Sequence, residues 1–149
     1  MTKSFSHGLA VVFSTLLGTG ASADEAEGDM SVFLTEPTAV ESFLWTNRPI
    51  VVFADSPADP RFIEQMELLE RDETALVERD VVVLVDTDPA AKSDLRTSFR
   101  PRGFMMVLIG KDGGVKLRKP FPWDVRELSR VIDKMPMRQQ EIRDRRGDN

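Results

Sequence analysis

The stretch from residue 103 to residue 119, GFMMVLIGKDGGVKLRK, constrains the fold of this chain more than any other feature. Its first part is apolar at every position from 104 to 109, which is typical of a strand buried on both faces. An Asp-Gly pair then supplies the positive backbone dihedral angle that a tight hairpin turn needs. In the second part Val115 and Leu117 are expected to face the core, and the basic residues beside them to face solvent. The stretch therefore predicts an antiparallel β-hairpin late in the chain.

The first 23 residues have the pattern of a secretory signal peptide. Lys3 gives a positive start, residues 9–17 are apolar, and small residues precede a cleavage point between Ala23 and Asp24. We therefore expect cleavage near Ala23/Asp24 and export to the periplasm or the extracellular space. The apolar stretch is too short for a membrane anchor, and no later stretch approaches the length of a membrane span.

The amino-acid composition excludes several kinds of chemistry. The chain has no Cys, and its single histidine, His7, lies in the expected signal peptide. The mature chain would then lack both thiol and imidazole groups, which excludes thiol redox chemistry, imidazole-activated nucleophiles, haem ligation and the usual zinc sites. A formal charge of −5 without a dominant basic patch also argues against nucleic acid as a partner. We expect no catalytic residue and no cofactor.

Helices and strands are expected to alternate along the part of the chain that precedes the hairpin. A short helix is predicted to open at Thr38, which can form a capping box with Glu41. Apolar strands follow at residues 50–54 and 81–85, and the first of them is expected to lie at the centre of the sheet. Asp-Pro pairs start the helices after these strands, because Asp accepts from free amides and Pro lacks one.

The end of the chain is expected to consist of one amphipathic helix and a charged tail. Asp124 and Glu127 form a second capping box, and apolar residues recur at helical spacing as far as Met135. Pro136 is expected to end this helix. Residues 138–149 are then predicted to be a charged tail that frays.

This order of elements predicts an α/β, thioredoxin-like fold for residues 37–137. Two parallel strands with a right-handed crossover and a C-terminal β-hairpin give a four-stranded mixed sheet flanked by helices. The main alternative, a flavodoxin-like sheet, would need a helix between the last two strands, where this sequence has a turn. Residues 24–36 are acidic and small, so we expect them to form a flexible segment before the domain.

Three stretches of the chain carry a family resemblance: RPIVVFADSPADPRFIEQ, GKDGGVKLR and IDKMPMRQQEIR. They resemble secreted thioredoxin-like domains of unknown function, found in bacterial exported proteins and in animal matrix proteins of the equarin and sushi-repeat type. The resemblance covers residues 42–143 and implies a thioredoxin-like fold, an exported location and no settled activity. Redox-active relatives have cysteines after the first strand and a cis-proline that faces them. Here that loop reads DSPAD and the proline position falls near Met105, which excludes a dithiol or peroxidatic mechanism.

Four aspartates are expected beyond the carboxyl ends of the two parallel strands, where open sheets commonly bind ligands. Asp55 and Asp86 are candidates for a calcium or magnesium site, because such cations prefer oxygen ligands. Asp59 and Asp88 are instead expected to act as helix N-caps. In the same loop, Ser56 has no histidine or lysine partner, so we expect it to hydrogen-bond within its own turn rather than to act as a nucleophile.

Polar residues in three places are candidates for binding a protein or peptide. Ser56 lies in the loop after the first strand. The hairpin carries a basic cluster that also includes Lys119, which either protects an edge strand from aggregation or contacts an anion or acidic peptide. The end of the last helix, MRQQE, is a candidate interaction surface. The candidates are Ser56, Lys111, Asp112, Lys116, Arg118, Arg138, Gln139, Gln140 and Glu141.

The sequence supports three hypotheses about function. The first is an exported, non-enzymatic domain that binds an unknown protein or peptide, and the composition favours it. The second is a redox or peroxiredoxin-related accessory protein that depends on a cofactor or on a partner's thiols. The third is a domain that binds calcium or magnesium through carboxylates.

Overall fold

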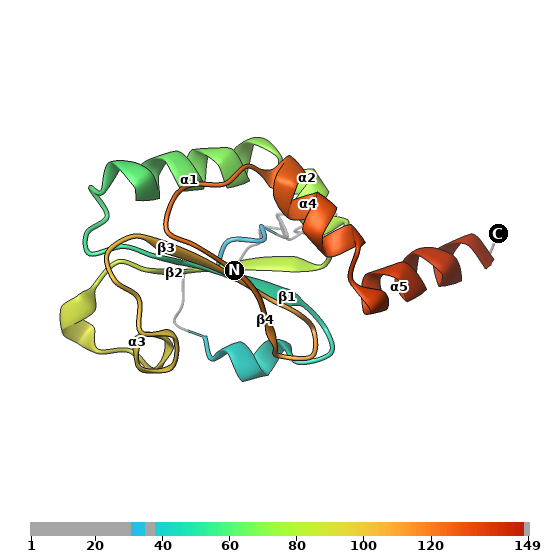
Figure 1. Ribbon diagram of the computed structural model, residues 1–149, viewed down its shortest axis with the longest axis horizontal. Coiled ribbons are helices and arrows are strands. Elements are labelled where there is room, and N and C mark those ends of the chain that lie inside the picture. Colours follow the sequence, from blue (N-terminus) through green and yellow to red (C-terminus); the bar gives the residue numbers. More distant parts are fainter. Residues whose placement is uncertain (1–30, 35–37, 148–149) are drawn as a thin grey trace, which may run out of the picture.

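A four-stranded mixed sheet lies at the centre of the computed structural model, which describes residues 31–34 and 38–147 (Figure 1). The strand order is β2-β1-β3-β4. β1 pairs with β2 in parallel and with β3 antiparallel, and β3 and β4 form an antiparallel hairpin. The predicted sheet of two parallel strands and a late hairpin is confirmed. The strands are β1 (Arg48–Phe53), β2 (Val81–Asp86), β3 (Met105–Ile109) and β4 (Val115–Lys119).

The central position of β1 explains its uniform burial. All six of its residues are buried, as the apolar run predicts. β2 is less completely buried, because it lies at the edge of the sheet. Residues 31–34 partly cover that edge: Phe33 bridges to Val83, and Val32 is 5% exposed. Residues 31–34 were expected to belong to a flexible segment, but they are attached to the sheet.

Helices cover both faces of the sheet. α1 (Pro60–Arg71), α2 (Glu73–Val77) and α4 (Val125–Asp133) lie on one face, and α3 (Asp94–Phe99) lies on the other (Figure 1). Successive residues of β1 alternate between the two apolar cores, because side chains along a strand point to opposite faces. The shorter 3-10 helices are η1 (Val40–Phe43) and η2 (Pro89–Ala91).

Side-chain caps fix most of the helix starts. Asp59, Asp88 and Asp124 each accept a hydrogen bond from a backbone N–H of the first turn, as predicted. The predicted capping box at Thr38 is wrong, because η1 begins at Val40 with Ala39 in the N-cap position and no side-chain cap.

The hairpin turn is built as its Asp-Gly pair predicts. Gly113 has a φ of +78°, and its N–H donates to the carbonyl oxygen of Gly110 over 2.9 Å. Leu117 packs against the core, as expected. Val115 does not: it is 43% exposed, and the pairing of β3 with β4 has an irregular register next to it, between Leu108 and Ile109.

A second C-terminal helix, α5 (Pro136–Gly147), replaces the predicted frayed tail. Pro136 begins this helix, since a proline fits the first turn, where its missing N–H has no helical partner. Arg138 is only 6% exposed. α5 extends away from the sheet (Figure 1). No helix in the described part of the chain is long and apolar enough to cross a membrane.

Candidate functional site

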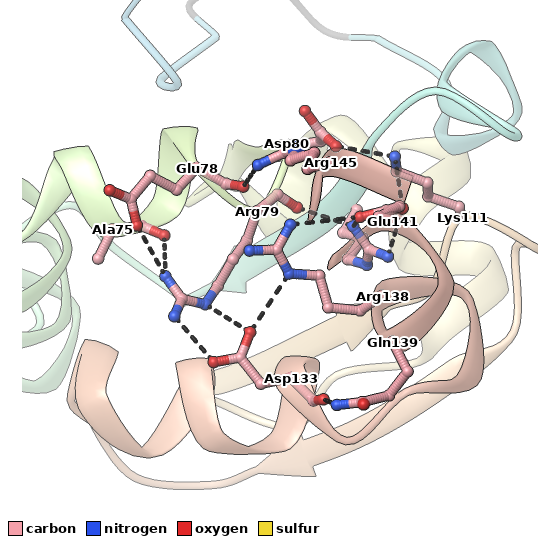
Figure 2. A network of polar contacts seen from close by, with 11 residues as sticks. Ala75, Glu78, Arg79, Asp80, Lys111, Asp133, Arg138, Gln139, Glu141 and Arg145 are labelled. Carbon is pink, nitrogen blue, oxygen red and sulfur yellow. Dashed lines mark hydrogen bonds and ion pairs between the residues drawn. The ribbon is translucent and has the colours of Figure 1, made fainter. Parts of the chain in front are cut away.

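A network of charged side chains lies at the end of the sheet where β1 begins (Figure 2). Arg48, 1% exposed, donates from Nη2 to Oε1 of Glu141 over 2.9 Å and from Nη1 to the carbonyl oxygen of Arg79 over 2.9 Å. Nζ of Lys111 lies 2.9 Å from the same Glu141 oxygen and 2.8 Å from Oδ2 of Asp80. Glu141 therefore joins α5 to the first strand and to the hairpin turn.

A second carboxylate, that of Asp133, extends this network to α4 (Figure 2). Nη2 of Arg79 donates to its Oδ2 over 2.8 Å, and Nε of Arg138 donates to its Oδ1 over 3.3 Å. Arg138 also reaches Oε2 of Glu141 over 3.4 Å. We call this network the α5 clamp, and its members are Arg48, Arg79, Lys111, Asp133, Arg138 and Glu141.

The electrostatics of the clamp keep its carboxylates ionised. Burial alone would raise the pKa of Glu141, but the hydrogen bonds from Arg48 and Lys111 prevail and lower it from 4.5 to about 2. Burial likewise opposes ionisation of Asp133, and the hydrogen bonds from Arg79 and Arg138 lower its pKa overall. Neither group is suited to exchange protons near neutral pH, so the clamp is a structural device.

The clamp accounts for the MRQQE candidates from the sequence. Arg138 and Glu141 are members of the clamp, and the side-chain amide of Gln139 donates to the carbonyl oxygen of Asp133. Gln140 donates to Asp144 over 2.5 Å within α5. These contacts explain Arg138 and Glu141 by intramolecular packing, whereas Met137 and the two glutamines are exposed to solvent.

The candidates in the hairpin turn are also engaged within the chain. Lys111 belongs to the clamp. Asp112 accepts from the N–H of Gly114 over 3.0 Å and from Nζ of Lys116 over 2.9 Å. The hydrogen bond from Lys116 is the largest cause that lowers the pKa of Asp112. Together these contacts fix the shape of the turn.

Arg96 lies at the opposite end of the sheet, where β1 and β2 finish, and its side chain contacts both strand ends. Its Nε donates to Oδ1 of Asp86 over 2.7 Å, and its Nη2 donates to the carbonyl oxygen of Ala54 over 2.5 Å. The hydroxyl of Ser93 donates to the other oxygen of Asp86. The guanidinium carbon of Arg96 also lies 5.7 Å from the centre of the Phe53 ring. Arg96 therefore ties both parallel strands to α3.

The proposed calcium or magnesium site is not assembled there. Asp86 is 8% exposed and paired with Arg96, whereas Asp55 is 66% exposed and lies 4.0 Å from Arg96 Nη1. Across residues 31–34 and 38–147, no three carboxylate, histidine or cysteine side chains gather in a way that could hold a metal ion. A guanidinium thus lies beside Asp86 where the metal hypothesis would place a cation.

Ser56 behaves as its sequence context predicts. Its Oγ accepts a hydrogen bond from the N–H of Ala58 over 3.1 Å, within its own turn. The residue is exposed, as are its neighbours Pro57 and Ala58. It therefore remains accessible to a partner without being an activated nucleophile.

A hollow of about 240 Å³ opens at the end of the sheet where β1 finishes. Its floor includes Met105, which pairs with Phe53, the last residue of β1. Of the basic hairpin cluster, only Arg118 and Lys119 line it, since β4 carries them away from Lys111 and Lys116. The lining residues are Arg100, Arg102, Phe104, Met105, Arg118, Lys119 and Pro120, and we call this site the cationic hollow.

Arg100 and Arg102 were not predicted from the sequence. They follow α3 directly and precede β3, and only the fold brings them next to the end of β4. Arg48 and Arg79 were missed as well, because an arginine before an apolar strand looks like an ordinary solvated residue. The signal for Arg100 and Arg102 in the sequence is the number of basic residues between 96 and 119, which form a predicted cluster only within the hairpin.

Comparison with solved structures defines the class of fold. Plasmodium vivax 2-Cys peroxiredoxin in its reduced form gives a TM-score of 0.53 at 15% identity, covering 68% of this chain and 84% of that one. Plasmodium yoelii thioredoxin peroxidase I gives a TM-score of 0.53 at 15% identity, covering 69% and 80%. The chain therefore has the thioredoxin-like fold that its sequence predicts.

The family follows from a match over most of the chain. The model described as "Domain of unknown function (DUF4174)" matches residues 39–141, and the chain belongs to this family. The match includes η1 at one end and Glu141 of the α5 clamp at the other. A search of curated proteins gives no match.

Proposed function

We propose that this protein is an exported, non-enzymatic domain that binds a protein or peptide at the end of the sheet where β1 and β2 finish. One observation carries the proposal. The loop after β1, where redox-active relatives carry their cysteines, is held by Arg96 and offers no thiol, while a hollow opens at Met105, which pairs with the last residue of β1. This absence of thiols beside an open hollow supports a binding role at this end of the sheet.

The side chains at this end support binding rather than catalysis. Asp86 is paired with Arg96, and Ser56 accepts from its own turn, so neither forms a nucleophile with an adjacent base. The exposed loop from Asp55 to Ala58 and the cationic hollow instead lie at the same end of the sheet, where both are open to a partner.

Photo-crosslinking in the native compartment tests this function. A photoreactive residue placed at Ala58, in the exposed loop, should capture a defined protein or peptide. The matched control places the same residue at Glu67, an exposed position on α1. Equal capture from both positions, or none from Ala58, would contradict the proposal.

The second hypothesis, a peroxiredoxin-related accessory protein, is favoured by the structural likeness to peroxiredoxins. It requires thiols supplied by a partner or a bound cofactor, because the chain has no Cys. Purified protein should therefore be assayed for peroxide consumption with a dithiol as the reductant. Turnover above that of the dithiol alone would support this hypothesis against the binding domain.

Export is part of the proposal and rests on the signal-peptide pattern and on the resemblance to secreted domains. The expected signal peptide falls outside the described residues. Amino-terminal sequencing of protein recovered from the periplasm or the medium should give a chain that begins near Asp24. Recovery of exported protein that still begins at Met1 would contradict cleavage.

A further inference from the structure

The cationic hollow carries an unbalanced positive charge. Its lining includes four basic residues and no carboxylate. The four basic residues are Arg100, Arg102, Arg118 and Lys119. None of them forms an ion pair with any residue that the structure describes. What distinguishes these four is that they gather around one hollow.

Other arginines of the same fold show the contrast. Arg48 and Arg138 are paired with Glu141, and Arg96 is paired with Asp86. Arg61, which lies over the ring of Phe104 close to the hollow, is paired with Asp59. The cations of the hollow differ from these arginines in having no ion pair with a described residue.

Aromatic rings hold two of these cations in place. The guanidinium carbon of Arg118 lies 5.5 Å from the centre of the Phe99 ring, and its Nη1 donates to the carbonyl oxygen of Phe99 over 2.9 Å. Nζ of Lys119 lies 4.3 Å from the centre of the Trp123 ring. Such contacts position a charge without neutralising it, so the hollow is prepared for an anionic ligand.

We propose that the cationic hollow binds a short acidic segment of a protein partner. Carboxylates of the segment would pair with the basic rim, and an apolar side chain would pack against Met105 and Pro120. This inference rests on the proposed binding function and names the chemistry of its ligand. It is independent of the clamp at the other end of the sheet.

The size and composition of the hollow favour this occupant over other anions. A volume of about 240 Å³ accommodates a few side chains rather than a large cofactor. Inorganic phosphate has no apolar group that could pack against the floor of the hollow. The negative charge of the whole chain would repel an extended polyanion such as nucleic acid, whereas a short acidic segment needs only the local cations.

Fluorescence anisotropy on the purified chain tests the inference. The probe is a fluorescein-labelled peptide of alternating glutamates with one phenylalanine, and its control is the same peptide with glutamine in place of glutamate. The double variant Arg100→Glu/Arg102→Glu should weaken binding by about tenfold or more, since it reverses two charges at the rim. The matched control is Arg71→Glu, at the far end of α1, which should bind within about twofold of the unchanged chain.

Several results would overturn the inference. They are the absence of binding, equal binding of the glutamine peptide, an equal effect of Arg71→Glu, and tighter binding of a single-stranded oligonucleotide or of phosphate than of the acidic peptide. Circular dichroism checks that each variant folds. If the partner captured at Ala58 binds the double variant unchanged, the inference fails and the proposed function stands. If no partner is captured at Ala58, the proposed function fails whatever the peptide result.

Discussion

The two ends of the sheet use the same kinds of residue in opposite ways. Where β1 begins, Arg48, Lys111 and Arg138 surround Glu141, and every charge is paired. Where β1 finishes, the charged residues of the hollow are all cations, and none of them forms an ion pair with a described residue. The first arrangement fastens α5 to the domain, whereas the second leaves charge available to a ligand.

The comparison shows that basic residues close together in the sequence can lie at opposite ends of the sheet and have different contacts. Lys111 and Lys119 are close in sequence, yet β4 carries the second to the opposite end of the sheet, ~14 Å along the strand from its start. One is a member of the clamp and the other lines the hollow. The basic cluster of the hairpin therefore consists of two separate features.

The largest effect is expected from removing the central cation of the clamp. Arg48→Met would leave Glu141 partly buried without its main partner and should lower the free energy of unfolding by about 4 kcal/mol. Urea denaturation measures this loss. Arg126→Met, at an exposed position of α4, serves as the control and should change stability by less than about 0.5 kcal/mol. Similar small effects for both variants would mean that the clamp does not hold the fold.

Acid should release the clamp through Glu141. Because its pKa in the folded chain, about 2, lies below the ordinary value of 4.5, its contribution is complete above pH 4.5 and is lost as the pH falls toward 2. The shift corresponds to about 3 kcal/mol of stability. Denaturation curves across this range should show that the difference between the unchanged chain and Glu141→Gln shrinks as the pH falls. A difference that stays constant would rule out this role of Glu141.

A smaller effect is expected at Arg96, on the other side of the comparison. Arg96→Met removes the partner of Asp86 and the donor to Ala54, and should cost about 2 kcal/mol. Amide hydrogen exchange should speed up in α3 and in the loop after β1, with the helices on the other face unchanged. Uniform exchange changes across the sheet would show that Arg96 does not act locally.

The smallest effect on stability is expected in the hollow itself. Arg102→Gln removes an exposed charge without an ion-pair partner in the described residues, so the free energy of unfolding should change by less than about 0.5 kcal/mol. Thermal denaturation checks this. A large loss of stability would mean that the hollow, like the clamp, is a structural feature.

Local patterns in the sequence predicted most of the fold. The apolar run of β1, the Gly113 turn and the Asp caps of α1 and α4 depend on neighbouring residues, and the structure confirms each of them. α5 was missed because Pro136 can either end one helix or begin another, and only tertiary contacts of Arg138 and Glu141 decide between these outcomes.

The site was less predictable because it is built from distant segments. The cationic hollow combines the end of α3, the start of β3 and the end of β4, and no local pattern links Arg100 to Lys119. The loop at Ser56 was predictable, since its hydrogen bond is made within the turn. The pairing of Asp86, a candidate metal ligand, with Arg96 was not, because the two residues come from different elements.

A titration of isotope-labelled protein with the acidic peptide, followed by amide chemical shifts, tests the contrast between the two ends most directly. We expect shifts confined to the amides of lining residues, with the amides of Arg48, Lys111 and Glu141 unchanged. The lining residues with an amide N–H are Arg100, Arg102, Phe104, Met105, Arg118 and Lys119. Shifts centred on the α5 clamp, or no shifts in the hollow, would contradict the account.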